Sequence, residues 1–201
     1  RKLDSRDLMI CNAEEPMCIA GVFGGLDSGV TEETTSVFLE SAYFNPTSVR
    51  KTARRHGLNT DASFRYERGT DPNATVYCIK LAALMIKELA GGEICGDIID
   101  LYPEAIKPFP VKLDYGYFNA LVGKAIPAET IDSIAASLEM EITGHEDNAV
   151  NLLVPTYRVD VQRPCDVVED VLRIYGYNNV EFSSELHSSL SFKTMTDSSN
   201  D

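Results

Sequence analysis

The sequence predicts an α+β fold divided into two modest domains. With 201 residues, of which 44% are hydrophobic and 24% charged, the chain can bury one good core or two small ones. The stretch YPEAIKPFP, residues 102–110, holds three prolines and predicts a linker. Strand-like runs and capped helical segments occur on both sides of it. We therefore expect one domain at 1–101, a second at 111–182, and a tail at 183–201.

Strands and turns open the first domain. Apolar runs at 8–11 and 18–23, separated by the turn-forming AEEP, predict a hairpin. GVFGG, residues 21–25, places three glycines within five residues, which suits a sharp turn or the close approach of another group. The aromatic run SVFLESAYF, residues 36–44, favours β structure and predicts a further strand.

Helices follow these strands. NPTSVRKTARRHG has Asn45 as N-cap, Pro46 at the first helical position and Gly57 just past the end. The next stretch, HGLNTDASFRYERGTDP at 56–72, is so rich in turn formers that we expect a loop. Residues 71–92 then predict a second helix, whose apolar stripe indicates core scaffold.

The second domain is predicted to be a small α+β unit with two or three helices and a hairpin. YFNALVG ends in glycine, and PAETIDSIAASL repeats apolar residues at the helical spacing of i, i+3, i+4 and i+7. MEITG and AVNLLVP follow, and RPCDVVEDVLRIYGY predicts a helix that begins near Pro164. The tail has seven serines and little apolar periodicity, so we interpret it as a linker to a downstream module.

Charge and cysteine content limit the partners and the compartment. The net charge of -13 argues against indiscriminate binding to nucleic acid or anionic membranes. Residues 41–80, however, hold seven Lys or Arg against three acids, so contact with a polyanion is expected only there. Five cysteines without a CxxC predict a reduced, cytoplasmic compartment. No apolar run approaches the ~20 residues that span a bilayer, so no membrane role is expected.

The beginning of the sequence suggests a piece of a longer protein. It lacks an initiator Met and starts inside a patterned segment, RKLDSRDLMICNA. No phosphate loop, zinc spacing, GxSxG or HExxH motif appears, which removes the simplest enzyme assignments. Histidine is scarce, and His56 is better explained as a cation at a helix C-terminus than as a catalytic group.

An acidic cluster in the second domain has two interpretations. If its helix begins near Pro164, several carboxylates converge and would suit a hard cation such as Mg²⁺. Alternatively, acids in a first helical turn favour the macrodipole, and Glu169 with Arg173 forms an ordinary i, i+4 pair. The candidate ligands are Asp160, Asp166, Glu169 and Asp170.

A second candidate site joins the glycine turn, Glu40 and the loop at 56–72. A carboxylate that reaches into a pocket floored by glycine backbone and Ala62 could accept a hydrogen bond from a hydroxyl-bearing ligand and reject an analogue without the hydroxyl. The alternative makes Glu40 a solvent-facing strand residue and the neighbouring arginines a surface ion-pair set.

Three segments together resemble a known family. They are AGVFGG, FLESAYFNPTSVRKTARRHGLNTDASFRYERGTDP and VPTYRVDVQRPCDVVEDVLRIYGY. They closely resemble the β subunit of bacterial phenylalanyl-tRNA synthetase, and the resemblance covers nearly all of residues 1–182. Residues 1–101 resemble the later part of its editing module, called B-three/four, and about 109–180 resemble the B-five module. The resemblance thus implies a mixed-sheet editing-type domain followed by a small winged-helix-like domain.

The resemblance implies proofreading of tyrosine that is wrongly attached to the phenylalanine tRNA. The family carboxylate that receives the tyrosyl hydroxyl matches Glu40. The small residues that shape the pocket match Gly24 and Ala62, with Thr60 alongside. The arginines that suit the approach of the tRNA end are Arg50, Arg54, Arg55 and Arg65. Since no residue presents itself as a nucleophile or a clear base, we expect backbone and substrate hydroxyls to position the attacking water.

The resemblance also implies cofactors and partners. Asp160, Asp166, Glu169 and Asp170 match family positions assigned to Mg²⁺ shared with the α subunit, although Asp170 stands where Glu is usual. The parent enzyme pairs two α with two β subunits and uses ATP, phenylalanine and the tRNA, while aminoacylation belongs to the α subunit. We expect the piece alone neither to aminoacylate nor to edit efficiently.

Two alternatives stay open beside this interpretation. The second domain could bind nucleic acid, including DNA, independently of charging, but its CDVVEDVLRIYGY helix is acidic and repels phosphate. Both domains could also be purely architectural and hold the heterotetramer together. An intact set of Glu40, Gly24 and Ala62 speaks against that view.

Overall fold

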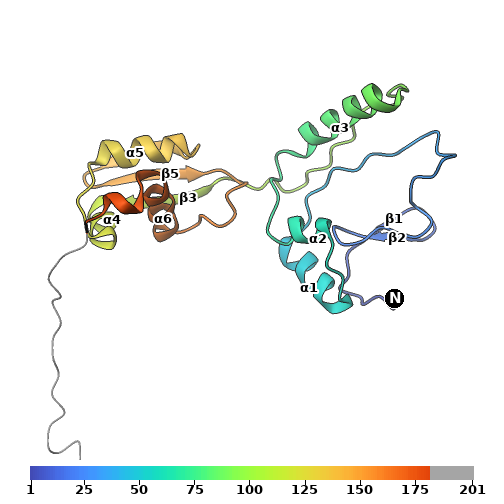
Figure 1. Cartoon of the computed structure of the whole chain (residues 1–201), viewed down its shortest axis with the longest axis horizontal. Helices are drawn as coiled ribbons and strands as arrows, with labels where there is room; N and C mark the ends of the chain where they lie inside the picture. Colours follow the sequence, from blue (N-terminus) through green and yellow to red (C-terminus); the bar gives the residue numbers. More distant parts are fainter. Residues whose placement is uncertain (182–201) are drawn as a thin grey trace, which may run out of the picture.

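The computed structural model describes residues 1–181 of the chain. Figure 1 shows two units joined at a narrow waist, the first built from residues before the proline-rich stretch and the second from residues after it. Helices and small antiparallel sheets occur in both units, which confirms the α+β class. The predicted tail at 183–201 lies outside the described residues. Among the described residues, no helix is long and apolar enough to cross a membrane.

The first unit opens with the predicted hairpin. Strands β1 (Met9–Cys11) and β2 (Pro16–Ile19) pair antiparallel, with Met9 opposite Ile19. The chain then turns back through the glycine segment, where Phe23 forms a bridge to Ile19. Gly21 has a φ of +67°, and a Cβ there would lie 3.0 Å from the Phe44 ring, so this position requires glycine.

Helix α1 (Pro46–His56) forms as its end signals predict. The Asn45 side chain accepts a hydrogen bond from the Ser48 backbone N–H at 3.1 Å, and Gly57 ends the helix in the left-handed region. Its buried side chains Val49 and Ala53 pack with Val22 in a small core. The helix therefore holds the glycine turn in place.

Two predictions for residues 36–72 of the first unit are wrong. Residues 36–44 form no strand, because no described strand lies beside them to supply ladder hydrogen bonds. The expected loop at 56–72 contains a short helix, α2 (Asp61–Tyr66). Thr60 and Ser63 close a capping box at its start, so the polar residues that suggested a loop in fact begin a helix.

Helix α3 (Thr75–Ala90) begins four residues later than predicted and is not core scaffold in the described structure. None of its residues is buried, and Tyr77, Leu84 and Leu89 are exposed. Its apolar stripe is real, but no element in residues 1–181 packs on it closely enough to bury a side chain. Together with the extended segments 37–39 and 91–99, it lines an apolar groove of about 520 Å³.

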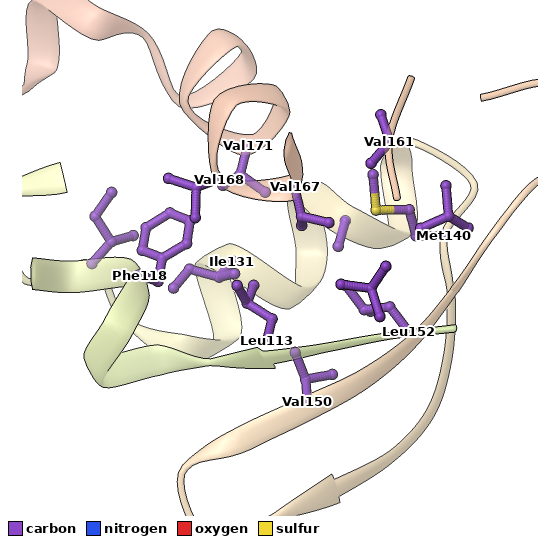
Figure 2. Packing of buried hydrophobic residues seen from close by; sticks show 14 residues of the cluster. Leu113, Phe118, Ile131, Met140, Val150, Leu152, Val161, Val167, Val168 and Val171 are labelled. Carbon is purple, nitrogen blue, oxygen red and sulfur yellow. The ribbon is translucent and has the colours of Figure 1, made fainter. Parts of the chain in front are cut away.

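The second unit matches the prediction more closely. Its sheet has the order β3–β5–β4, formed by β3 (Phe109–Asp114), β4 (Glu141–Glu146) and β5 (Ala149–Val154), all antiparallel. Its helices are α4 (Tyr115–Val122), α5 (Ala128–Ser137) and α6 (Pro164–Tyr175), and a 3₁₀ turn follows at Tyr177–Asn179. Figure 2 shows Leu113, Phe118, Ile131, Leu152 and Val171 packed between sheet and helices. This is the larger of the two cores.

Candidate functional site

An open pocket of about 470 Å³ lies in the first unit, between the hairpin, the extended segment before α1, and α2. Gly24, Glu40, Thr60 and Ala62 all line it, so the structure brings the four predicted pocket residues together. They come from three segments that are far apart in the sequence. Ala62 and Tyr66 of α2 line one part of the pocket, and Ile10, Cys18 and Ile19 of the β1–β2 hairpin line another.

Glu40 is the carboxylate of this pocket. The residue as a whole is exposed, but the protein atoms around its carboxyl group remove enough water to raise its pKa. The pKa of Tyr66 and that of Cys18 are both raised. Burial is the larger cause, and the negative charge of Glu40 is the second. Glu40 thus acts electrostatically on both sides of the pocket.

Aromatic rings form an apolar wall beside Glu40. The rings of Phe44 and Tyr66 lie with their centroids 5.1 Å apart and their planes inclined at 54°. Both line the pocket, as does Cys18. Phe44, Tyr66 and Cys18 are not among the pocket residues that the sequence predicts. Tyr66 follows Ala62 by four positions, a helical spacing that would have indicated a shared face had α2 been expected.

The four predicted tRNA-contacting arginines differ in accessibility. Arg50 and Arg54 on α1 and Arg65 on α2 are exposed. Arg55 instead forms an ion pair with Asp7, whose side chain is completely buried. Arg55 is therefore engaged in the fold, whereas the other three are free to meet a polyanion.

Asp7 also explains the position of His56. The His56 Nε2 atom lies 2.7 Å from the Asp7 carboxylate, and the Thr52 hydroxyl donates to the same carboxylate at 3.0 Å. Burial by itself would raise the pKa of Asp7, but hydrogen bonds from a backbone N–H, His56 and Thr52 lower it to about 2. These contacts to Asp7 connect the N-terminal segment to α1, and His56 therefore has a structural role.

The predicted metal ligands in the second unit do not come together. Within residues 1–181, no group of three or more His, Cys, Asp or Glu side chains is arranged to hold a metal ion. Three of the four carboxylates are instead paired with arginines from the same sequence motif. The guanidinium of Arg163 lies 2.8 Å from the Asp166 carboxylate, and that of Arg173 lies 2.8 Å from the Glu169 carboxylate. Asp170 pairs with Arg158.

The surroundings of the acids fit a structural role. Asp166 accepts hydrogen bonds from the Arg163 side chain and backbone N–H, and these bonds lower its pKa. Burial raises the pKa of Asp170, against the lowering effect of Arg158. A cation at this place would have to displace guanidinium groups, so the described arrangement does not fit Mg²⁺. The ion pair between Glu169 and Arg173 confirms the alternative interpretation that the sequence offered, and the other two arginines were visible in the same segment.

Comparisons with known proteins define the class of the chain. Residues 1–91 match the B3/4 domain, and residues 111–177 match the tRNA synthetase B5 domain. These two matches account for the two units of the fold. The chain is therefore built from modules of an aminoacyl-tRNA synthetase.

The relatives identify the synthetase. Over 200 residues the chain is 66% identical to the phenylalanine–tRNA ligase β subunits of Bacteroides fragilis and Bacteroides thetaiotaomicron, with 100% of this chain and 24% of each relative covered. It is 52% identical over 198 residues to that of Porphyromonas gingivalis, with 98% of this chain and 24% of the relative covered. The chain belongs to the phenylalanine–tRNA ligase β-subunit family, and it spans about a quarter of the length of these relatives.

Proposed function

We propose that the chain serves in a phenylalanine–tRNA ligase, and that the pocket of its first domain hydrolyses tyrosine wrongly attached to the phenylalanine tRNA. One observation carries the editing proposal: Gly24, Glu40, Thr60 and Ala62 line a single pocket although three separate segments supply them. The parent enzyme would join an α to this β subunit in an α2β2 assembly, use ATP, and work in the cytoplasm. Free thiols at all five cysteines agree with that compartment.

The pocket chemistry suits discrimination by a hydroxyl group. Tyrosine exceeds phenylalanine by one hydroxyl, and the Glu40 carboxylate can accept its hydrogen bond. A phenylalanyl ester would leave a partly desolvated carboxylate without that bond, which penalises its binding. The wall formed by Phe44 and Tyr66 would pack against the substrate ring in either case.

The approach of the tRNA end would use exposed charge beside the pocket. Arg65 lies on α2, which also contributes Ala62 to the pocket, and Arg50 and Arg54 lie on α1. Arg55 is excluded from this role by its pairing with Asp7. Because phosphate contacts release counterions, binding should weaken as salt rises.

Mg²⁺ and the second domain have no assigned step in this reaction. The arginine pairs of Asp166, Glu169 and Asp170 leave Asp160 as the one acid of that set without an ion pair in residues 1–181. We propose that the B5 unit serves contacts with the α subunit. Mg²⁺ binding shared with that subunit remains a separate prediction, and it would require the arginines to move.

The test is hydrolysis of tyrosyl-tRNA by the complete αβ enzyme. Glu40→Ala and Glu40→Gln should each slow deacylation of the tyrosyl ester about ten- to hundredfold, because Ala removes the acceptor and Gln removes its charge. Charging with phenylalanine should be unchanged. Glu33→Ala, at an exposed position of the same domain, is the matched control. If Glu40 variants edit like wild type, the pocket assignment fails and an architectural role takes its place.

A further inference from the structure

The Thr60 hydroxyl group is already engaged within the protein. It donates a hydrogen bond to the Val22 carbonyl oxygen at 2.6 Å and accepts one from the Ser63 backbone N–H at 3.0 Å. A threonine hydroxyl has one donor and two acceptor positions. Its only donor is thus used, and Thr60 cannot donate to a substrate carbonyl or oxyanion without breaking the bond to Val22.

The Ser63 side chain forms hydrogen bonds to the backbone of Thr60. Its hydroxyl accepts a hydrogen bond from the Thr60 backbone N–H and donates to the Thr60 carbonyl oxygen, both at 3.0 Å. Ser63 is only 3% exposed and does not line the pocket. A change at Ser63 therefore disturbs the placement of Thr60 without removing any group that faces the pocket.

The bond between Thr60 and Val22 joins the two sides of the pocket. Gly24 follows Val22 by two residues on one side, and Ala62 follows Thr60 by two residues on the other. Val22 is 1% exposed, and its N–H bonds back to the Ile19 carbonyl oxygen, so its backbone position is fixed. We propose that Thr60 is a positioning residue that sets the separation between Gly24 and Ala62, rather than a group that contacts the ester.

This inference rests on the proposed editing function. A pocket of defined width holds the aromatic side chain so that the ester bond meets the attacking water in one geometry. Loosening the width should mainly slow the chemical step, since a misplaced ester still binds. The expected effect is therefore larger on kcat than on KM.

The experiment compares four variants of the complete αβ enzyme in deacylation of tyrosyl-tRNA, with kcat and KM measured separately. Thr60→Ser keeps the hydroxyl and should edit like wild type. Thr60→Val and Ser63→Ala each remove a hydroxyl that makes two hydrogen bonds, so each should lower kcat about five- to a hundredfold. Thr47→Val, at an exposed position on α1, is the matched control. Phenylalanine charging and thermal unfolding confirm that each variant is folded.

A second readout does not depend on editing. Amide hydrogen exchange in residues 60–66 should be faster in Thr60→Val and Ser63→Ala than in wild type, and unchanged in Thr60→Ser. If Ser63→Ala edits and exchanges like wild type while Thr60→Val loses activity, Thr60 contacts the substrate directly and the proposal is overturned. If Glu40→Gln also edits normally, the editing function itself fails, whereas unchanged exchange in Thr60→Val would refute the positioning role alone.

Discussion

Glu40 gives the pocket a predictable dependence on pH. Burial raises its pKa, so it takes up a proton at a higher pH than an ordinary glutamate, whose pKa is about 4.3. Only the ionised carboxylate is a pure acceptor for the tyrosyl hydroxyl. Selectivity for tyrosyl over phenylalanyl ester should therefore be constant above the raised pKa and fall as pH drops through it. The ratio of the two deacylation rates, measured from pH 4 to 8, reports this change.

Glu40→Gln supplies the control for that titration. An amide does not ionise in this range, so the variant should show a low selectivity ratio that does not vary with pH. Using the ratio removes the pH dependence of ester hydrolysis itself, since both esters share it. The same inflection in the variant would show that another group, such as one on the tRNA, titrates instead.

At the scale of elements, Gly57 is the clearest test of what ends a helix. It closes α1 with a φ of +60°, and a Cβ at this position would meet no atom within 4 Å. Gly57→Ala should cost about 1 kcal/mol of unfolding free energy, because only backbone strain opposes it. Gly57→Asn should cost less, since Asn tolerates the left-handed region. Urea unfolding of the chain measures both values.

A glycine that does not have a left-handed φ serves as the control for Gly57. Gly144 in β4 also has open space around its Cβ position but does not have a left-handed φ. Gly144→Ala should therefore change stability little. Equal losses for Gly57→Ala and Gly57→Asn would mean that the C-cap conformation is not what limits α1.

The elements that the sequence predicted correctly are those with local causes. Helix α1 has its N-cap, proline and C-terminal glycine within thirteen residues, and α5 has its apolar spacing within one segment. The strand expected at 36–44 and the burial expected for α3 depend on partners elsewhere in space, and propensity does not reveal whether a partner is present. Helix α2 was missed because Ser63 takes the capping-box position that Glu or Gln usually holds.

The same distinction applies to the candidate site. Residue chemistry suggested a pocket of the glycine turn, Glu40 and Ala62, the family resemblance added Thr60 and specified Gly24, and the fold places all four around one pocket. Arg55 could not be excluded from the sequence, because its partner Asp7 lies 48 residues away. The predicted convergence of the carboxylates of α6 on a metal ion is not observed, for a different reason. Helical spacing predicts the Glu169–Arg173 pair, but it does not show that Asp166 pairs with Arg163 or that Asp170 pairs with Arg158.

At the scale of the whole molecule, the two units are joined by more than the proline-rich linker. Thr156 of the B5 unit is 5% exposed, and its hydroxyl donates to the Asp71 carboxylate at 3.0 Å. The same hydroxyl accepts a hydrogen bond from the Asn73 side chain at 2.9 Å. Beside it, a Cβ on Gly69 would lie 2.8 Å from the Val159 side chain, so the backbones approach closely there. This joint follows directly after α2, the wall of the pocket.

Thr156→Val should loosen this joint. The substitution keeps the side-chain shape but leaves the Asp71 carboxylate and the Asn73 amide without their shared partner, at a cost of about 1–3 kcal/mol. We expect the units to separate around residues 91–108, which small-angle scattering would detect as a larger radius of gyration and limited proteolysis as faster cleavage there. Thr156→Ser should restore the wild-type values, and Thr143→Val, at an exposed position in β4, should not change them.

If Thr156→Val leaves both measurements unchanged, the linker and the Gly69–Val159 contact suffice to hold the units together. In that case the pocket wall and the B5 unit are coupled through packing rather than through the Thr156 hydroxyl.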